Sequence, residues 1–202
     1  TDVYNYIVAT LFKRNDFQSG MLYKFISNTP SDGSSGTRLK ANVISPYFKA
    51  SIGKTYVEGQ INYLWGEMRS EEAPVMPFYD SRDIDSYSWY LMGKYNIGRG
   101  YLGAMYAYVR GDDPDTDDLE GNIAGFGGSA DWNPCLILWN NEFNRWMDDM
   151  GFNPGSTASY EMTNASLYQV FVGASPVEKL SVSASYPYAR ANEKQGRLSA
   201  EY

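Results

Sequence analysis

The stretch "KLSVSASYPYAR", Lys179 to Arg190, decides the fold class of this chain. Every second residue from Leu180 onward is apolar or aromatic, and the residues between them are mostly serine. A repeat of two is the side-chain period of a β-strand. The alternation lasts about ten residues, whereas strands of soluble proteins usually run about five or six and a membrane-spanning strand needs about 9–11. The stretch therefore predicts a long strand with one face apolar from end to end.

Similar stretches recur along the chain and predict nine strands, most of them long enough to cross a membrane. They cover residues 3–14, 16–27, 38–52, 54–67, 85–97, 101–111, 166–175, 179–190 and 197 to the end. The second, fourth and fifth alternate cleanly, while the first, third and sixth carry apolar residues on both faces. Pro46 and Pro187 lie inside two of these segments and cannot donate a ladder hydrogen bond, which predicts a bulge or a local edge at each.

The connections between these segments alternate in length. Short turns (RND, IGK, NIGRG and SPVEK) follow the first, third, fifth and seventh segments, and long connections follow the second, fourth and sixth. Outer-membrane barrels have short periplasmic turns and longer extracellular loops, whereas a soluble sandwich has no reason to sort loop lengths by side. The sequence therefore predicts an all-β fold, an antiparallel transmembrane β-barrel that forms a single domain over residues 1–202.

The direction of the first strand bears on the ends of the chain. If the short turns are periplasmic, Thr1 lies on the outer side, whereas the N-terminus of such barrels is normally periplasmic. We therefore expect at least one strand before Thr1 and a continuation after Tyr202. Because nine is an odd number of strands for a bacterial barrel, we expect these strands to be part of a larger barrel, incomplete at both ends.

Composition narrows the class of function. The chain of 202 residues has 17 basic and 24 acidic side chains and a net charge of −7, which disfavours a nucleic-acid binder. It has no histidine and one cysteine, Cys135, so the common proton shuttle, the nucleophile pairs that need histidine and multi-cysteine metal sites are excluded. We expect no enzymatic activity. The 18 tyrosines and 5 tryptophans suit a water–lipid boundary, although a tyrosine-rich soluble β-protein would show the same excess.

The alternation also assigns side chains to the two sides of the predicted barrel. In lipid every backbone polar group must be paired internally, which a sheet achieves by closing. A Lys or Arg that faces hydrocarbon near the midplane would cost roughly 2–4 kcal/mol, so the charged and polar alternates are predicted to line the lumen. They are Lys24, Lys54, Glu58, Gln60, Asn62, Lys94, Arg197 and Glu201. The predicted aromatic girdle residues are Tyr4, Tyr6, Phe12, Tyr63, Trp65, Tyr87, Trp89, Tyr95, Tyr186 and Tyr188.

The longest connection, residues 111–165, is predicted to be an extracellular loop or a loop folded into the lumen. Its segment DWNPCLILWNNEFNRWMDDMG predicts one short helix, which Asn133 can cap, Pro134 can begin and Gly151 can end. One face of this helix carries Trp139, Phe143, Trp146 and Met147. Two placements stay open for that face: packing against the barrel wall, or narrowing of the pore as a constriction helix.

An acidic run, GDDPDTDDLEGN, begins the same connection. Asp113, Asp115 and Asp117 occupy alternate positions, as at the start of an EF-hand loop, but Asp118 replaces the required glycine and Ala124 the final glutamate. An EF-hand is therefore not predicted. The alternatives are calcium held loosely by these three carboxylates and a solvated acidic loop at the cell surface. No other cofactor is expected.

The rhythm of strands and loops over the whole chain resembles that of a Gram-negative outer-membrane porin-like β-barrel. The segment ADWNPCLILWNNEFN makes the chain similar, more loosely, to the alginate-export type of barrel. That resemblance implies a lumen rich in Arg and Lys that passes an anionic polysaccharide. Here the inward tally is four basic residues (Lys24, Lys54, Lys94 and Arg197) against two acidic ones, which is a mild excess. The expectation is therefore passive passage of small polar or anionic solutes rather than of alginate.

The sequence thus predicts a transport channel in the bacterial outer membrane, with solutes crossing a charged lumen. The expected partners are the lipid bilayer, lipopolysaccharide and small polar solutes, with no nucleic acid, and a homo-oligomer is left open. Two other functions also stay open. A soluble secreted carbohydrate-binding β-sandwich would explain the aromatic residues, and a barrel could serve as a surface scaffold or adhesin through its long loops.

Overall fold

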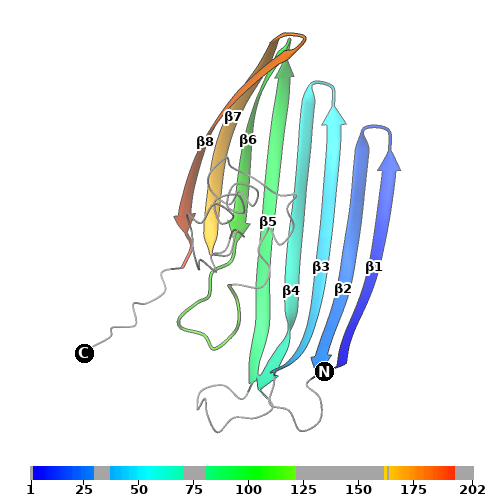
Figure 1. Ribbon diagram of the computed structural model, residues 1–202, viewed down its shortest axis with the longest axis vertical. Coiled ribbons are helices and arrows are strands. Elements are labelled where there is room, and N and C mark those ends of the chain that lie inside the picture. Colours follow the sequence, from blue (N-terminus) through cyan, green and yellow to red (C-terminus); the bar gives the residue numbers. More distant parts are fainter. Residues whose placement is uncertain (1, 30–36, 71–80, 122–161, 163, 194–202) are drawn as a thin grey trace, which may run out of the picture.

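Eight long strands form one antiparallel sheet in the computed structural model, which describes residues 2–29, 37–70, 81–121, 162 and 164–193. Each strand pairs with its neighbours in sequence, in the order β1 to β8 (Figure 1). The strands are β1 Asp2–Arg14, β2 Phe17–Thr29, β3 Thr37–Ile52, β4 Thr55–Ser70, β5 Ser81–Ile97, β6 Gly100–Val109, β7 Ala165–Val177 and β8 Leu180–Ala191. The predicted all-β antiparallel fold is confirmed.

The sheet differs from the sequence prediction in its closure. The outermost strands β1 and β8 do not pair with each other, so the described strands form an open sheet and not a closed barrel. The predicted ninth strand and the predicted short helix within residues 111–165 lie outside the described residues. None of the described residues is helical, and they therefore contain no helix long and apolar enough to cross a membrane.

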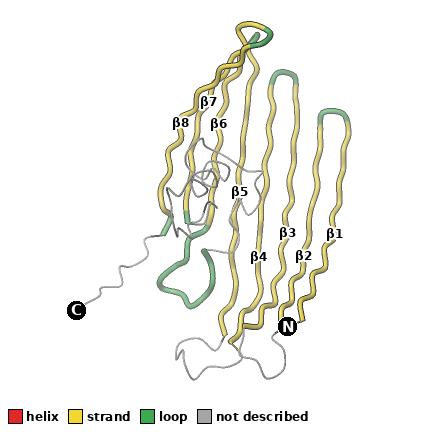
Figure 2. The backbone as a smooth tube through the Cα atoms, in the orientation of Figure 1, coloured by secondary structure: helices red, strands yellow, loops and turns green. Residues whose placement is uncertain are grey.

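Short turns and long connections lie at opposite ends of the sheet (Figure 2). The turns at residues 15–16, 53–54, 98–99 and 178–179 share one end, called here the turn end; the other is the loop end. Two-residue hairpin turns need positive φ values, which glycine adopts without strain. Gly53 and Gly98 supply them, with φ of 61° and 58°. The predicted sorting of connection lengths is therefore confirmed.

The register separates the side chains into two faces, because residues directly opposite each other in neighbouring strands point to the same side. Tyr63 lies opposite Tyr87, and this side is called here the aromatic face. Lys49 lies opposite Glu58 on the other side, called here the polar face. All of the predicted girdle residues lie on the aromatic face.

The two prolines within strands have different effects on the pairing. Ser45 and Pro46 have no partner on β4, although the register of β3 with β4 is the same on both sides of them. Pro187 lies opposite Gln169 on the edge strand β8, without a register shift. The irregularity of that hairpin lies between Ala174 and Val177 instead. Among the described strands Pro187 therefore lies on an outermost strand, and no bulge is found there.

Large rings lie over glycines of neighbouring strands on the polar face. Gly103 is opposite Phe171, and a Cβ at Gly103 would meet the Phe171 ring and come within 2.6 Å of the carbonyl oxygen of Gly93. A Cβ at Gly93 itself would meet nothing within 4 Å. The ring thus occupies the space that a side chain would take, and the position requires glycine because of this close approach.

We expect Gly103→Ala to lower the free energy of unfolding by about 1–3 kcal/mol, because the Phe171 ring and the β5 backbone must shift. Gly93→Ala is the matched control and should change it by less than about 0.5 kcal/mol. Urea-induced unfolding of both variants measures the difference. Equal stability of the two variants would contradict this packing.

Candidate functional site

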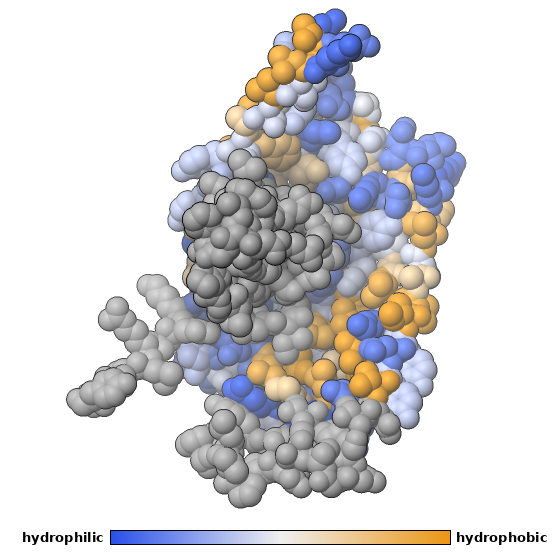
Figure 3. Space-filling view, in the orientation of Figure 1, coloured by the Kyte–Doolittle hydropathy of each residue, from blue (hydrophilic) through white to orange (hydrophobic). Residues whose placement is uncertain are grey.

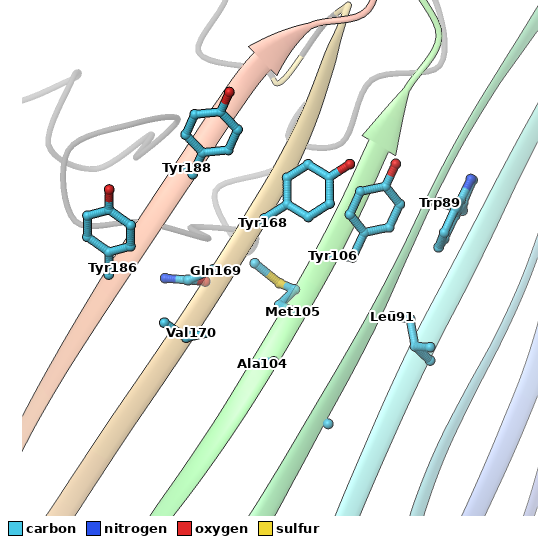
Figure 4. A pocket seen from close by; sticks show the side chains of 11 residues that line it. Trp89, Leu91, Ala104, Met105, Tyr106, Tyr168, Gln169, Val170, Tyr186 and Tyr188 are labelled. Carbon is cyan, nitrogen blue, oxygen red and sulfur yellow. The ribbon is translucent and has the colours of Figure 1, made fainter.

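A row of rings crosses β5 to β8 on the aromatic face (Figure 4). The ring centres of Trp89 and Tyr106 lie 4.9 Å apart, those of Tyr106 and Tyr168 4.7 Å apart, and those of Tyr168 and Tyr188 6.2 Å apart. Each strand therefore contributes rings at the same level, near the loop end. Rings arranged in such a band are typical of a boundary between water and an apolar medium.

Apolar side chains continue from this row toward the turn end and are exposed. Leu91 is 47% exposed and Val170 56% exposed. Between them lies an apolar hollow of about 590 Å³, lined by Gly93 and Ala104 as well as by the rings (Figure 4). Exposed apolar side chains lie on this face in all eight strands, whereas soluble monomers rarely expose contiguous apolar patches of more than a few hundred Å².

Charged side chains on the aromatic face are confined to the ends of the strands. Among the side chains that the structure describes they are Arg14, Arg38, Lys40, Glu67, Arg69, Asp83, Asp85 and Arg190. Hydrophilic residues also gather at the hairpin tips, at the top of Figure 3. The exposed apolar surface is therefore a belt bounded by charge at both of its rims.

Glu58 is the centre of a hydrogen-bonded group on the polar face. Its carboxylate accepts hydrogen bonds from the hydroxyls of Tyr56 at 2.5 Å and Tyr90 at 3.5 Å, and Lys49 Nζ lies 3.8 Å from it. Lys94 Nζ lies between two rings, 5.5 Å from the centre of Tyr56 and 5.4 Å from that of Tyr101. These contacts fix the positions of the charged side chains, and Lys49 and Glu58 stay partly exposed.

A second polar group lies next to the first on the same face. Gln60 Nε2 donates to Asn62 Oδ1 at 2.8 Å, and Asn62 Nδ2 donates to Ser88 Oγ at 3.3 Å. On β2 and β3, Gln18 Nε2 donates to the Tyr47 hydroxyl at 2.8 Å. Polar contacts thus run from β2 to β6 across the half of this face near the turn end.

The structure brings most of the predicted lumen-lining residues together on the polar face. Lys24, Glu58, Gln60, Asn62 and Lys94 share it. Lys54 does not lie within a strand as predicted but in the turn between β3 and β4, because that hairpin closes through Gly53 and Lys54. The predicted lumen residues Arg197 and Glu201 and the predicted constriction helix residues lie outside the described residues.

Sequence reasoning missed three basic residues of the polar face, namely Lys13, Lys49 and Arg82. The described strands therefore place five basic side chains (Lys13, Lys24, Lys49, Arg82 and Lys94) and one acidic side chain (Glu58) on this face. The basic excess is larger than the sequence tally indicated. Pairing the third predicted strand with the fourth in register would have placed Lys49 opposite Glu58, and therefore on the same face.

The polar face is apolar and buried near the loop end. Leu64 and Ile84 form one buried cluster, against which Leu119 packs. Val109, Leu167 and Met162 belong to a second cluster. Leu119 and Met162 both come from the connection between β6 and β7, so its described parts pack on the polar face. Both predicted placements of this connection, extracellular or folded into the lumen, stay predictions.

Arg110 fixes the start of this connection. Its guanidinium donates to Asp85 Oδ2 at 2.5 Å and to Glu120 Oε1 at 2.7 Å, and Glu120 is only 3% exposed. Burial opposes the charge of Arg110, but the hydrogen bond to Asp85 and the charge of Glu120 outweigh it and raise the pKa above its ordinary value. Leu119 also forms a parallel bridge with Ile84. The segment therefore extends along β5 where β6 has ended.

The acidic run does not form a cation cage among the described residues. Asp113 Oδ1 accepts a hydrogen bond from the backbone N–H of Asp115 at 2.9 Å, which is a local turn. Within the described part of the chain no three acidic, cysteine or histidine side chains are placed to hold a metal ion together. Calcium binding by Asp113, Asp115 and Asp117 stays a prediction.

Comparison with known proteins gives no family for the chain. A scan against models of protein families finds no match, and a search of curated proteins finds none either.

We expect Arg110→Met to destabilise the protein by about 1–3 kcal/mol, because the buried Glu120 carboxylate loses its cationic partner. The double variant Arg110→Met, Glu120→Gln removes the buried charge as well and should recover part of that loss. Thermal unfolding and limited proteolysis within residues 111–118 measure stability and attachment. If the single and double variants are equally destabilised, Glu120 is not the group that Arg110 stabilises.

Proposed function

We propose that this chain forms part of the wall of an outer-membrane channel, with the aromatic face toward lipid and the polar face toward a water-filled lumen. The observation that carries this proposal is the aromatic face. It is apolar across all eight strands, charged only at its rims, and not covered by a second sheet among the described residues. Hydrocarbon is the environment in which such a surface is stable without a protein cover.

The height of the belt supports the same conclusion. On β5 the uncharged part of the aromatic face runs from Tyr87 to Ile97, which is about 33 Å along the strand at roughly 3.3 Å per residue. Strands of outer-membrane barrels are tilted by about 40°, so this length corresponds to a belt of about 25 Å, as in known barrels.

The open edges of β1 and β8 are part of the proposal. In lipid the backbone N–H and C=O groups of an edge strand have no water to bind, so each edge must be paired. We propose that these edges close with further strands or with each other in the membrane. The open arrangement of the described strands does not fix the number of strands in the barrel.

The polar face supports passage of hydrated solutes with a preference for anions. Its basic side chains outnumber its single acidic one by five to one in the described strands. Fixed positive charge along a water-filled path raises the local concentration of anions and lowers that of cations. The proposed solutes are therefore small polar molecules and anions. A soluble carbohydrate-binding sandwich would explain the aromatic rings. It would not require the apolar and the basic side chains to be separated onto two faces.

Opposite faces of one strand give a direct test of the membrane assignment. Leu91→Lys, on the aromatic face, should lower the free energy of unfolding in a bilayer by about 2–4 kcal/mol, because the lysine meets hydrocarbon. Met92→Lys, the matched control on the polar face, should cost much less. Urea titration of vesicle-inserted protein measures both. A protein that is monomeric and stable in buffer without detergent, with Leu91→Lys as stable as Met92→Lys, would overturn the proposal.

We expect a conductance in planar bilayers that favours chloride over potassium. Lys49→Glu combined with Lys94→Glu should shift the reversal potential in a KCl gradient toward cation selectivity, because two positive charges of the proposed lumen become negative. Arg14→Glu, which reverses one positive charge on the aromatic face, should leave the selectivity as it is. Absence of current from well-folded, inserted protein would favour the scaffold or adhesin function.

A further inference from the structure

Lys94, on the polar face near the turn end, is held by aromatic rings and not by a carboxylate. Its ammonium nitrogen lies 5.5 Å from the ring centre of Tyr56 on β4 and 5.4 Å from that of Tyr101 on β6. Among the described residues no carboxylate lies within ion-pair distance of Lys94, whereas Lys49 on the same face is paired with Glu58. The rings therefore stabilise the positive charge of Lys94 without neutralising it.

A third ring lies close to Lys94 because the strand between them carries a glycine. Lys94 is opposite Gly103 on β6, and Gly103 is opposite Phe171 on β7. The Phe171 ring occupies the place of the missing Cβ, and its centre lies 6.2 Å from that of Tyr101, with the two ring planes at 62°. Lys94, Tyr101 and Phe171 are called here the lysine–ring group, and all three are partly exposed.

The surface next to the lysine–ring group, toward the loop end, is apolar. Met92 precedes Lys94 on the same face of β5 and lies opposite Met105 on β6. Thioether sulfurs make favourable contacts with aromatic rings and are only weak hydrogen-bond acceptors. A small hydrated anion would therefore contact the ammonium alone, whereas a ligand with an apolar body would also contact the rings and the thioethers.

The charge and the rings together indicate the kind of anion. One ammonium group balances one unit of negative charge, which is the charge of a carboxylate at neutral pH. A phosphate monoester carries about 1.5 to 2 units and is matched better by guanidinium groups, which bind two of its oxygens. A planar ring attached to the carboxylate can pack against Phe171 and Tyr101 in the offset or edge-to-face arrangements that aromatic pairs prefer.

We propose that the lysine–ring group binds aromatic carboxylates, with the carboxylate of the solute on Lys94 and its ring against Phe171 and Tyr101. This inference rests on the proposed channel and names the class of solute that the channel selects. A general excess of positive charge attracts any small anion, whereas this site adds ring contacts to the charge. It therefore distinguishes an aromatic carboxylate from chloride or acetate.

The test measures how sodium benzoate reduces the chloride current of the full chain in planar bilayers. A bound carboxylate neutralises Lys94, so the current should fall as benzoate is added, and the titration gives an apparent dissociation constant. We expect Lys94→Gln to raise this constant about tenfold or more, since a charge-assisted contact is lost. Phe171→Leu keeps an apolar side chain over Gly103 and should raise it about threefold, since only the ring contact is lost.

Lys24→Gln is the matched control, because it removes the same charge from the same face. The register places Lys24 level with Ser86, far along β5 from Lys94, so salt screens its charge from the lysine–ring group. It should change the constant for benzoate by less than about twofold. Equal constants for Lys94→Gln and Lys24→Gln would overturn the site.

Two further anions provide the second arm of the test. Acetate has the carboxylate without a ring and should inhibit the unchanged protein about tenfold more weakly than benzoate. Cyclohexanecarboxylate has an apolar ring that is not planar, and inhibition as strong as that by benzoate would overturn the assignment to aromatic solutes. The chloride current before benzoate is added tests the channel itself. A current that benzoate leaves unchanged refutes only this inference, whereas absence of current from inserted protein refutes the proposed function.

Discussion

The exposed aromatic face is the constraint on which the rest of the structure depends. Burial of apolar surface is the main favourable contribution to folding, roughly 25 cal/mol for each Å² removed from water. Here side chains such as Leu91 and Val170 lie about half exposed on a sheet that has no second layer among its described residues. Unless another medium covers this face, the strands gain little from folding. In the proposed function, hydrocarbon would supply that cover, and it would also account for charges that appear only at the rims.

Alternation was sufficient to predict the eight described strands, their antiparallel order and the common face of the predicted girdle residues, because a period of two can be read directly from the sequence. Alternation could not assign side chains to a face where both faces of a strand carry apolar residues. On β1 and β3 the pattern did not say which residues point together, so Lys13 and Lys49 were missed, and the register now places them. Arg82 was missed for another reason: Ser81, Arg82 and Asp83 are all polar, so the start of β5 gave no alternation to follow.

The polar face is divided along its length, and this division was not visible in the sequence. Its half near the turns carries hydrogen-bonded polar groups around Glu58 and Asn62. Its half near the loops is buried and apolar around Ile84 and Leu167, with Leu119 and Met162 packed against it. Single-strand periodicity cannot reveal this pattern, because it arises from contacts with a connection distant in sequence.

The two faces impose opposite demands on Arg and Lys, and the structure separates them accordingly. On the polar face, basic residues lie along the length of the strands, where water can solvate them and nearby rings and Glu58 hold them in place. On the aromatic face, the same residue types occur only beyond the aromatic side chains, where the proposed membrane would offer headgroups and water. A soluble sheet has no reason to restrict charge on one face to its two ends. The distribution of charge by depth, more than the number of aromatic residues, therefore favours a membrane as the second layer of this fold.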